Sequence, residues 1–374
     1  MCVLFTSAQE RIGVVVIAMA AIGCGTHHQS TPTADGLAEA VSVETQSVSR
    51  RSRKSQFKQS LSEYDLFREP LGELQPAAEV IEYDLNTPLF SDYSQKQRLV
   101  RLPRGTSATY RSQGPLEFPI GTIIAKTFYY ANDLNDDTGK RRLIETRILE
   151  HREDGWTGIP YLWNEDQTDA SLAIAGAAVD VSWKHTDGAQ RTNTHVVPNV
   201  NDCKRCHANP TMQPIGPKAN NLNRDFGYDE GTENQLAYWS RSGIVSGLPQ
   251  LIDIPRLAVW HDEASGTIDE RARAYLEVNC AHCHNPIGPA RNSGLHLNIE
   301  ATDPYRLGVF KTPVAAGRGT GGRLYGIVPG RPDESIMDHR MRTVTPGEVM
   351  PEFGRSLIHE EGLALIRQWI TEIE

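Results

Sequence analysis

The chain has 374 residues, of which 39% are hydrophobic and 23% are charged, values typical of a soluble globular protein with apolar cores. This length favours two or three domains. The formal net charge is −9 at pH 7. Because nucleic-acid binding needs a basic face, this charge argues against a nucleic-acid partner and suits a partner protein with a basic surface.

The N-terminal segment has the pattern of an export signal. An apolar run extends from Ile12 to Gly23 and meets Cys24. About a dozen apolar residues match the centre of a signal peptide and are too few for a membrane-spanning helix of roughly 20 residues. The string Ala-Ile-Gly-Cys that ends at Cys24 resembles a bacterial lipobox. That resemblance implies a signal peptide over 1–23, a lipid on Cys24 and a periplasmic protein anchored to the membrane. A plain secretory signal and a retained anchor are the alternatives.

Residues 24–200 consist of two parts that differ in composition. Residues 24–60 are rich in Ser, Thr and Gln, which predicts a disordered linker. The ranges 98–102 and 120–130 are dense in β-branched and aromatic residues. Residues 179–183 alternate with period two and precede a turn signal at Asp187-Gly188. We therefore expect a β-rich, sandwich-like domain over 61–200.

The remaining residues favour helices. Residues 201–265 are rich in Pro and Asn, with one short helix expected near 233–241. Thr267 and Glu270 form a capping box that opens a helix. Leu363, Ile366 and Trp369 have helical spacing at the end of the chain. A helical region is therefore expected over 266–374.

The pattern Cys-x-x-Cys-His occurs twice, at Cys203–His207 and at Cys280–His284. It is the attachment signature of c-type haem, in which two thiols bind the haem vinyl groups and the histidine binds the iron. The sequence therefore predicts two covalently bound haem c groups. They would be attached through Cys203, Cys206, Cys280 and Cys283, with His207 and His284 as iron ligands.

The other cysteines support this prediction. Of the six, Cys2 would leave with the signal peptide and Cys24 would carry lipid, so none is left for a disulfide. Two Cys-x-x-Cys pairs can also bind zinc, but zinc sites do not require a histidine directly after both pairs.

Residues 266–374 resemble a class I cytochrome c domain. A helix leads into the second motif, a long irregular stretch follows, and Met350-Pro351 precedes the terminal helix. The resemblance implies an all-α domain with His284 as proximal and Met350 as distal iron ligand. A thioether is a soft, neutral ligand that favours ferrous iron. Met337 and Met341 are the alternatives, although both are expected to pack in the core as part of a helix over 335–341.

The sixth ligand of the first haem stays open. Met212 lies only five positions beyond His207, which is a strained path around a porphyrin edge. His185 and His195 lie upstream and His261 lies downstream. A vacant position is the remaining alternative. Four arginines either pair with haem propionates or lie solvated on the surface, namely Arg318, Arg323, Arg331 and Arg340.

Residues 80–374 resemble a family of bacterial di-haem c-type cytochromes without an assigned reaction. The resemblance is based on the sequence segments 86–92, 118–122 and 198–203. We therefore expect an α+β multidomain fold: a sandwich-like β-rich domain, a haem-binding segment over 201–265 and an all-α cytochrome c-like domain over 266–374.

The expected function is electron transfer with a redox partner protein. One alternative is a di-haem oxidoreductase of peroxidase-like or small-substrate type, with the first haem catalytic and the second an electron relay. The weakest alternative is a β-domain binding module in which haem is only a structural element.

Overall fold

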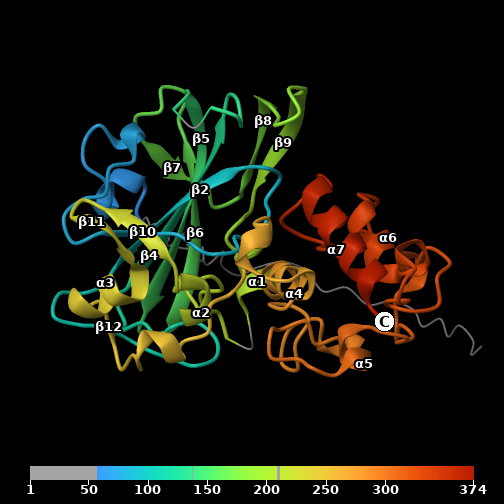
Figure 1. Cartoon of the computed structure of the whole chain (residues 1–374). Coiled ribbons are helices and arrows are strands. Elements are labelled where there is room, and N and C mark those ends of the chain that lie inside the picture. Colours follow the sequence, from blue (N-terminus) through green and yellow to red (C-terminus); the bar gives the residue numbers. More distant parts are fainter. Residues whose placement is uncertain (1–56, 137, 209–210) are drawn as a thin grey trace, which may run out of the picture. The chain divides into compact units, whose positions relative to one another are not determined.

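The computed structural model describes residues 57–136, 138–208 and 211–374 (Figure 1). The expected signal peptide, the lipidation site Cys24 and most of the expected linker lie outside these residues. The described residues all belong to one compact unit. The domain boundaries expected at 200 and 265 stay predictions.

The largest element is a six-stranded antiparallel sheet with strand order β1-β2-β4-β5-β6-β7. Its strands are β1 (Ile81–Tyr83), β2 (Gln95–Arg101), β4 (Ile123–Ala131), β5 (Arg141–Arg152), β6 (Gly155–Trp163) and β7 (Ala170–Leu172). The strands expected within 98–102 and 120–130 are confirmed as parts of β2 and β4. Neighbouring strands therefore place alternate residues on two distinct faces of the sheet.

The other strands form three small pairs. They are the hairpin of β8 (Ala177–Lys184) and β9 (Gln190–Val197), the hairpin of β10 (Asp225–Tyr228) and β11 (Gly231–Asn234), and the parallel pair of β3 (Ala108–Thr109) and β12 (Val245–Ser246). The turn expected at Asp187-Gly188 is confirmed, since it joins β8 to β9 and Gly188 has a φ of 83°. A positive φ of this kind costs glycine little.

The two faces of the main sheet have different coverings. One face packs against the chain before β1, where Leu61 and Tyr64 lie in one apolar core with Leu99, Ile148 and Ile159. The opposite face packs at one end against α2 (Ala219–Leu222) and α3 (Gln235–Arg241), through a core that contains Leu222 and Trp239. The β8–β9 hairpin also packs against the main sheet, through Val181 and Trp183, so the covering layers are irregular segments, helices and one hairpin.

The described residues contain five further α-helices, and in Figure 1 α4 lies between the main sheet and α7. They are α1 (Cys203–His207), α4 (Ile268–Asn279), α5 (Pro304–Leu307), α6 (Ile336–Arg342) and α7 (Glu360–Glu372). The capping box of Thr267 and Glu270 is confirmed at the start of α4. Leu276 of α4 packs with Ile366 and Trp369 of α7 in one core.

The predicted fold class is wrong. Helices account for only about 24% of the described residues, which contain seven α-helices, so an all-α class I cytochrome c-like domain is absent from the described part of 266–374. Its middle helices, α5 and α6, have four and seven residues. Closely spaced prolines and glycines from Pro286 to Gly354 account for this, because both residue types interrupt helices.

The expected division into a β-rich domain and a separate haem-binding segment stays a prediction. Strand β12, from the expected haem-binding segment, pairs with β3 of the expected β-rich domain. The β8–β9 hairpin also packs against the main sheet, where Val181 and Trp183 share one apolar core with Tyr130 and Ile144. Short β pairs between distant parts of the chain are not visible in local periodicity.

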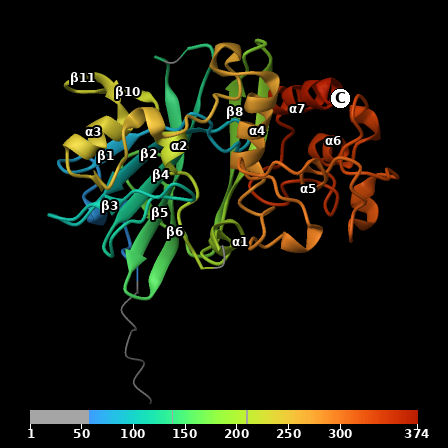
Figure 2. The same ribbon diagram turned by 60° about the horizontal axis from the view of Figure 1, so that its bottom comes forward.

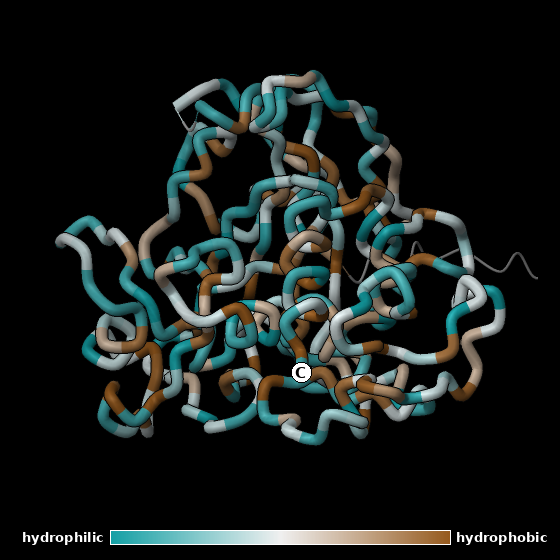
Figure 3. The backbone as a smooth tube through the Cα atoms, turned by 45° about the vertical axis from the view of Figure 1, so that its right-hand side comes forward, coloured by the Kyte–Doolittle hydropathy of each residue, from teal (hydrophilic) through white to brown (hydrophobic). Residues whose placement is uncertain are grey.

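Apolar and hydrophilic stretches alternate along the backbone (Figure 3). Within the ranges that the structure describes, no helix is both long enough and apolar enough to span a membrane.

Candidate functional site

Both Cys-x-x-Cys-His motifs contribute to the lining of one cavity of about 470 Å³. The first motif provides Cys203, Cys206 and His207, and the second provides Cys280 and His282. The rest of the lining comes from one face of the main sheet, from α4 and from residues 350–359. In Figure 2 the helices α1 and α4 lie on the same side of β6. The structure therefore brings together two motifs that are far apart in the sequence.

The first motif forms the short helix α1, which packs against β6. One helical turn places Cys203, Cys206 and His207, at positions i, i+3 and i+4, on the same face. A Cβ atom added at Gly158 of β6 would lie 2.8 Å from the Cβ atom and 2.9 Å from the Sγ atom of Cys203. The close approach of α1 to the sheet thus depends on a glycine at position 158.

His207 is held in one tautomer. Its Nδ1 lies 2.8 Å from the carbonyl oxygen of Gln213, to which it donates a hydrogen bond. Burial lowers the pKa of His207 to about 3, so the ring is neutral at pH 7. A neutral imidazole with Nδ1–H bound to a carbonyl keeps a lone pair on Nε2, which is the state that a metal ligand needs.

The second motif follows directly on α4. The Nδ1 of His284 lies 3.0 Å from the hydroxyl of Ser293, and burial followed by the charge of Arg340 lowers the pKa of His284 to about 4. Burial raises the pKa of Cys280 to about 12 and that of Cys283 to about 11. Cys283 and His284 are not among the residues that line the cavity.

These residues fit covalently bound haem. The four motif cysteines form no disulfide in the described structure. Each motif histidine has its Nδ1 engaged by a protein oxygen, which leaves Nε2 for iron. Haem iron is held by the porphyrin and one or two axial ligands. In the described residues, no group of three or more His, Cys, Asp or Glu side chains is placed to hold a metal ion by itself.

The methionine expected as distal ligand lies at the cavity. Met350 and Met341 both line it, whereas Met337 packs in the apolar core between α4 and α7. The backbone N–H of Met350 donates to the carbonyl of Arg340 at 2.9 Å, and its carbonyl accepts from the Arg355 guanidinium at 2.7 Å. Hydrogen bonds of both its N–H and its carbonyl group therefore hold the backbone of Met350 in place.

The histidines expected as sixth ligand of the first haem are differently placed. His195 lines the cavity, but its Nε2 lies 2.7 Å from Glu145 and its Nδ1 lies 3.3 Å from the hydroxyl of Tyr130. His185 and His261 are not part of the cavity lining. Both nitrogens of the one cavity histidine among these candidates thus have protein partners.

Met212 lies beside the first motif. Its Cε atom would be 2.8 Å from a Cβ atom added at Gly158, the same glycine that Cys203 approaches. Like His185 and His261, Met212 is not among the cavity-lining residues.

Two cavity histidines were not singled out by the sequence. His282 lies inside the second motif, and burial lowers its pKa to about 4. His359 precedes α7, accepts a hydrogen bond from the Tyr275 hydroxyl at 3.0 Å and stacks on Phe90 with 4.1 Å between ring centroids. No sequence motif marks His359, and only the tertiary structure shows that it lies at the cavity.

Four basic residues of the main sheet also line the cavity and were missed. They are Lys96, Arg98, Lys126 and Arg147. Arg98 of β2 lies opposite Lys126 of β4, which lies opposite Arg147 of β5, so three cations form a row across three strands. Burial, followed by the charges of Arg147 and Arg98, lowers the pKa of Lys126 to about 7. One feature of the sequence could have indicated this row, namely Lys126 inside the apolar stretch 123–131.

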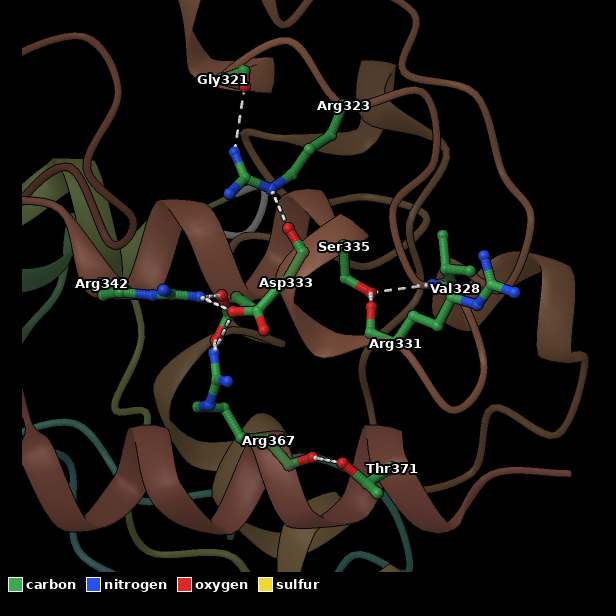
Figure 4. Close-up of polar contacts among 10 residues, drawn as sticks. Gly321, Arg323, Val328, Arg331, Asp333, Ser335, Arg342, Arg367 and Thr371 are labelled. Carbon is green, nitrogen blue, oxygen red and sulfur yellow. Dashed lines mark hydrogen bonds and ion pairs between the residues drawn. The ribbon is translucent and has the colours of Figure 1, made fainter.

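Four arginines were considered either as partners of haem propionates or as solvated surface residues, and Figure 4 shows two of them, Arg323 and Arg331. Arg323 donates to the carbonyl oxygens of Asp333 and Gly321 at 2.7 and 3.0 Å, and Arg331 pairs with Glu334 at 3.2 Å. Arg340 donates to the carbonyl of Glu348 at 3.0 Å. These three residues and Arg318 are not among the cavity-lining residues. Their positions therefore do not support contacts with the propionates of a haem in the cavity.

One buried carboxylate joins the sheet region to the segment that carries Met350. Asp92 accepts hydrogen bonds from the backbone N–H groups of Ser356 and Leu357 at 2.9 and 2.8 Å and from the Ser356 hydroxyl at 2.8 Å. Asp92 and Ser356 both line the cavity. The cavity wall is thus closed by residues that are 264 positions apart.

Comparison with known proteins identifies no relative: no protein-family model, no curated protein and no solved structure matches this chain.

Proposed function

We propose that this chain is a di-haem c-type cytochrome that carries electrons between redox partner proteins. The observation that carries the proposal is that both Cys-x-x-Cys-His motifs border one cavity with free cysteines and with the Nδ1 of each motif histidine engaged. Haem iron supplies one-electron chemistry by changing between the ferrous and ferric states. The expected export signal and Cys24 would place the protein in the periplasm, anchored by lipid.

The roles of the residues follow from their chemistry. Cys203 and Cys206 would hold one haem and Cys280 and Cys283 the other. His207 and His284 would provide the proximal nitrogens, with Gln213 and Ser293 orienting the rings. Met350, held by Arg340 and Arg355, would provide the distal sulfur at the second centre.

The closeness of the two motifs supports direct electron transfer within the chain. Cys203, Cys206 and His207 of the first motif line the same cavity as Cys280 and His282 of the second. The two attachment sites would therefore let electrons pass without a third centre.

The haem content tests this proposal. The intact mass of the mature protein, made in a host that attaches c-type haem, should correspond to the chain with two haems. The double variants Cys203→Ala/Cys206→Ala and Cys280→Ala/Cys283→Ala should each lose one haem. A mass without haem, together with bound zinc, would refute the proposal.

The contact between α1 and β6 gives a second prediction. Replacing Gly158 by valine should destabilise the protein by about 1–3 kcal/mol, because the added atoms overlap Cys203. It should also lower haem occupancy on the peptide that contains Cys203, measured by mass spectrometry, and leave the peptide that contains Cys280 unchanged. Gly227→Val is the control, since a Cβ atom there meets nothing within 4 Å. Equal occupancy and equal thermal stability in both variants would contradict the prediction.

One observation favours the oxidoreductase as a second candidate. His195 is the one cavity histidine among the expected sixth ligands, and both of its nitrogens have protein partners. A first haem without a sixth protein ligand would bind a small molecule. A high-spin ferric spectrum with cyanide binding would support this candidate, and low-spin spectra for both haems without cyanide binding would exclude it.

A further inference from the structure

The cavity face of the main sheet carries more positive than negative charge. Arg98 pairs with Asp84 at 2.7 Å, and Arg147 binds Glu145 through its Nε at 2.8 Å. Lys96 donates to a backbone carbonyl, that of Ser94, at 2.9 Å. Among the described residues, the Lys126 side chain has no hydrogen-bond or ion-pair partner, and its Nζ lies 5.0 Å from the ring centroid of Phe128. Two of the four cations thus have no carboxylate partner.

This arrangement is costly for the chain alone. Like charges directly opposite each other on neighbouring strands destabilise a sheet. Lys126 lies between two such charges, Arg98 on one side and Arg147 on the other. A buried ammonium without an anion also loses hydration that nothing replaces. The whole chain has a net charge of −9, so a shortage of carboxylates does not explain the surplus of cations at this place.

The other carboxylates that line the cavity have partners other than the two lysines. Asp202 pairs with Arg205 at 3.3 Å and Glu352 with Arg340 at 3.9 Å. Glu277 is engaged with Lys218, and Asp92 accepts its hydrogen bonds from residues 356 and 357. Glu145 is shared by Arg147 and His195. In the proposed haem-bound protein, Cys203 and Cys206 would be thioethers, which carry no charge. An anion from outside this set of side chains would satisfy the lysines.

We propose that Lys96, Arg98, Lys126 and Arg147 form a binding site for a carboxylate group in the cavity. Planar guanidinium groups and a flexible ammonium are the side chains that bind carboxylates best in partly buried places. Two sources have this chemistry. One is a propionate of a haem attached to the chain, and this source rests on the proposed function. The other is a free small dicarboxylate that enters the cavity.

Thermal unfolding of the holoprotein separates the two sources. The test variant is Lys126→Met, which keeps the length of the side chain and removes its charge, with Lys96→Met as the second variant. The control is Lys184→Met, which removes a cation on β8 that pairs with Asp133 at 2.9 Å and does not line the cavity. Each protein is unfolded with and without succinate as the probe, and succinate binding is measured by calorimetry.

A haem propionate in the site predicts that Lys126→Met lowers the melting temperature by a few degrees without added anion, since the bound carboxylate loses its partner. A free carboxylate predicts that Lys126→Met raises the melting temperature without succinate. In that case succinate binds and stabilises the unmodified protein, and binding is at least tenfold weaker in Lys126→Met but unchanged in Lys184→Met.

The proposal is overturned if neither lysine variant lowers the melting temperature and succinate does not bind the unmodified protein. The haem count is measured separately on the same samples. If no haem is attached, the proposed function fails, whereas the succinate measurement still tests the site, because the four cations belong to the chain.

Discussion

Replacing Glu145 by glutamine is expected to lower the free energy of unfolding by about 3–5 kcal/mol, because it removes a fully buried negative charge that pairs with Arg147 and with buried His195. Glu145 accepts hydrogen bonds from Nε of Arg147 at 2.8 Å and from Nε2 of His195 at 2.7 Å. The variant leaves the Arg147 guanidinium without its carboxylate. Urea unfolding at pH 7, followed by circular dichroism, measures the change.

The same carboxyl predicts a pH dependence. Burial alone would raise the pKa of Glu145, but the charge of Arg147 and the hydrogen bond with His195 outweigh it and lower the pKa to about 2. A group with a lowered folded-state pKa stabilises the protein above its unfolded pKa of about 4.3 and loses that contribution as the pH falls toward 2. The lowered pKa of Glu145 corresponds to a contribution of about 3 kcal/mol to the free energy of unfolding. The unmodified protein should lose it between about pH 5 and pH 2, and Glu145→Gln should not.

A matched control lies on the same strand. Glu150 and Arg152 have the same spacing as Glu145 and Arg147, and their side chains are 27% and 20% exposed. Partly exposed ion pairs contribute about 0–1 kcal/mol, so Glu150→Gln should change stability little. Equal effects of the two substitutions would show that the burial of Glu145 has no special importance.

The largest expected effect on redox behaviour is at Met350. Replacing it by leucine should lower the midpoint potential of one haem and leave the other unchanged, since the soft thioether that favours ferrous iron is lost. The change should be a sizeable part of the roughly 0.8 V range over which axial ligands tune haem. Potentiometry followed by visible spectroscopy measures it, and the absorption of methionine-ligated ferric haem should disappear.

Met341 is the control for this substitution. It lines the same cavity but also belongs to the apolar core between α4 and α7. Met341→Leu preserves apolar volume, and its effect on the potential should be small. If Met341→Leu removes the absorption of methionine-ligated haem and Met350→Leu does not, Met341 is the distal ligand and Met350 is not.

Local sequence signals predicted local structure well. The strands β2, β4 and β8 and the helix α4 with its capping box follow from alternation and capping. Strand β5 was missed because its apolar positions are mixed with Arg141, Arg142, Glu145, Arg147 and Glu150, a pattern that suggests exposed chain. Arg141, Arg142 and Glu145 also have partners elsewhere in the chain, namely the carbonyls of Glu73 and Asp180 and the ring of His195, which local reasoning does not see.

The candidate site was predicted only in part. The motif residues were found because covalent attachment demands a fixed spacing within five residues. The basic row was missed because Arg98, Lys126 and Arg147 meet only through strand pairing. The all-α C-terminal domain was expected from two end helices and a Met-Pro pair, whereas the glycines and prolines between them produce loops.

The hydrogen bonds between Asp92 and residues 356–357 have a consequence for biosynthesis. On the export route proposed for this chain, Cys203 and Cys280 would emerge from the membrane well before residues 350–359. Until then, the wall that contains Met350, Arg355 and His359 is missing, and both motifs face an open side. Haem attachment would be easiest in this interval. A chain shortened before Ser356 should therefore still acquire thioether bonds, yet leave its haems accessible to exogenous ligands.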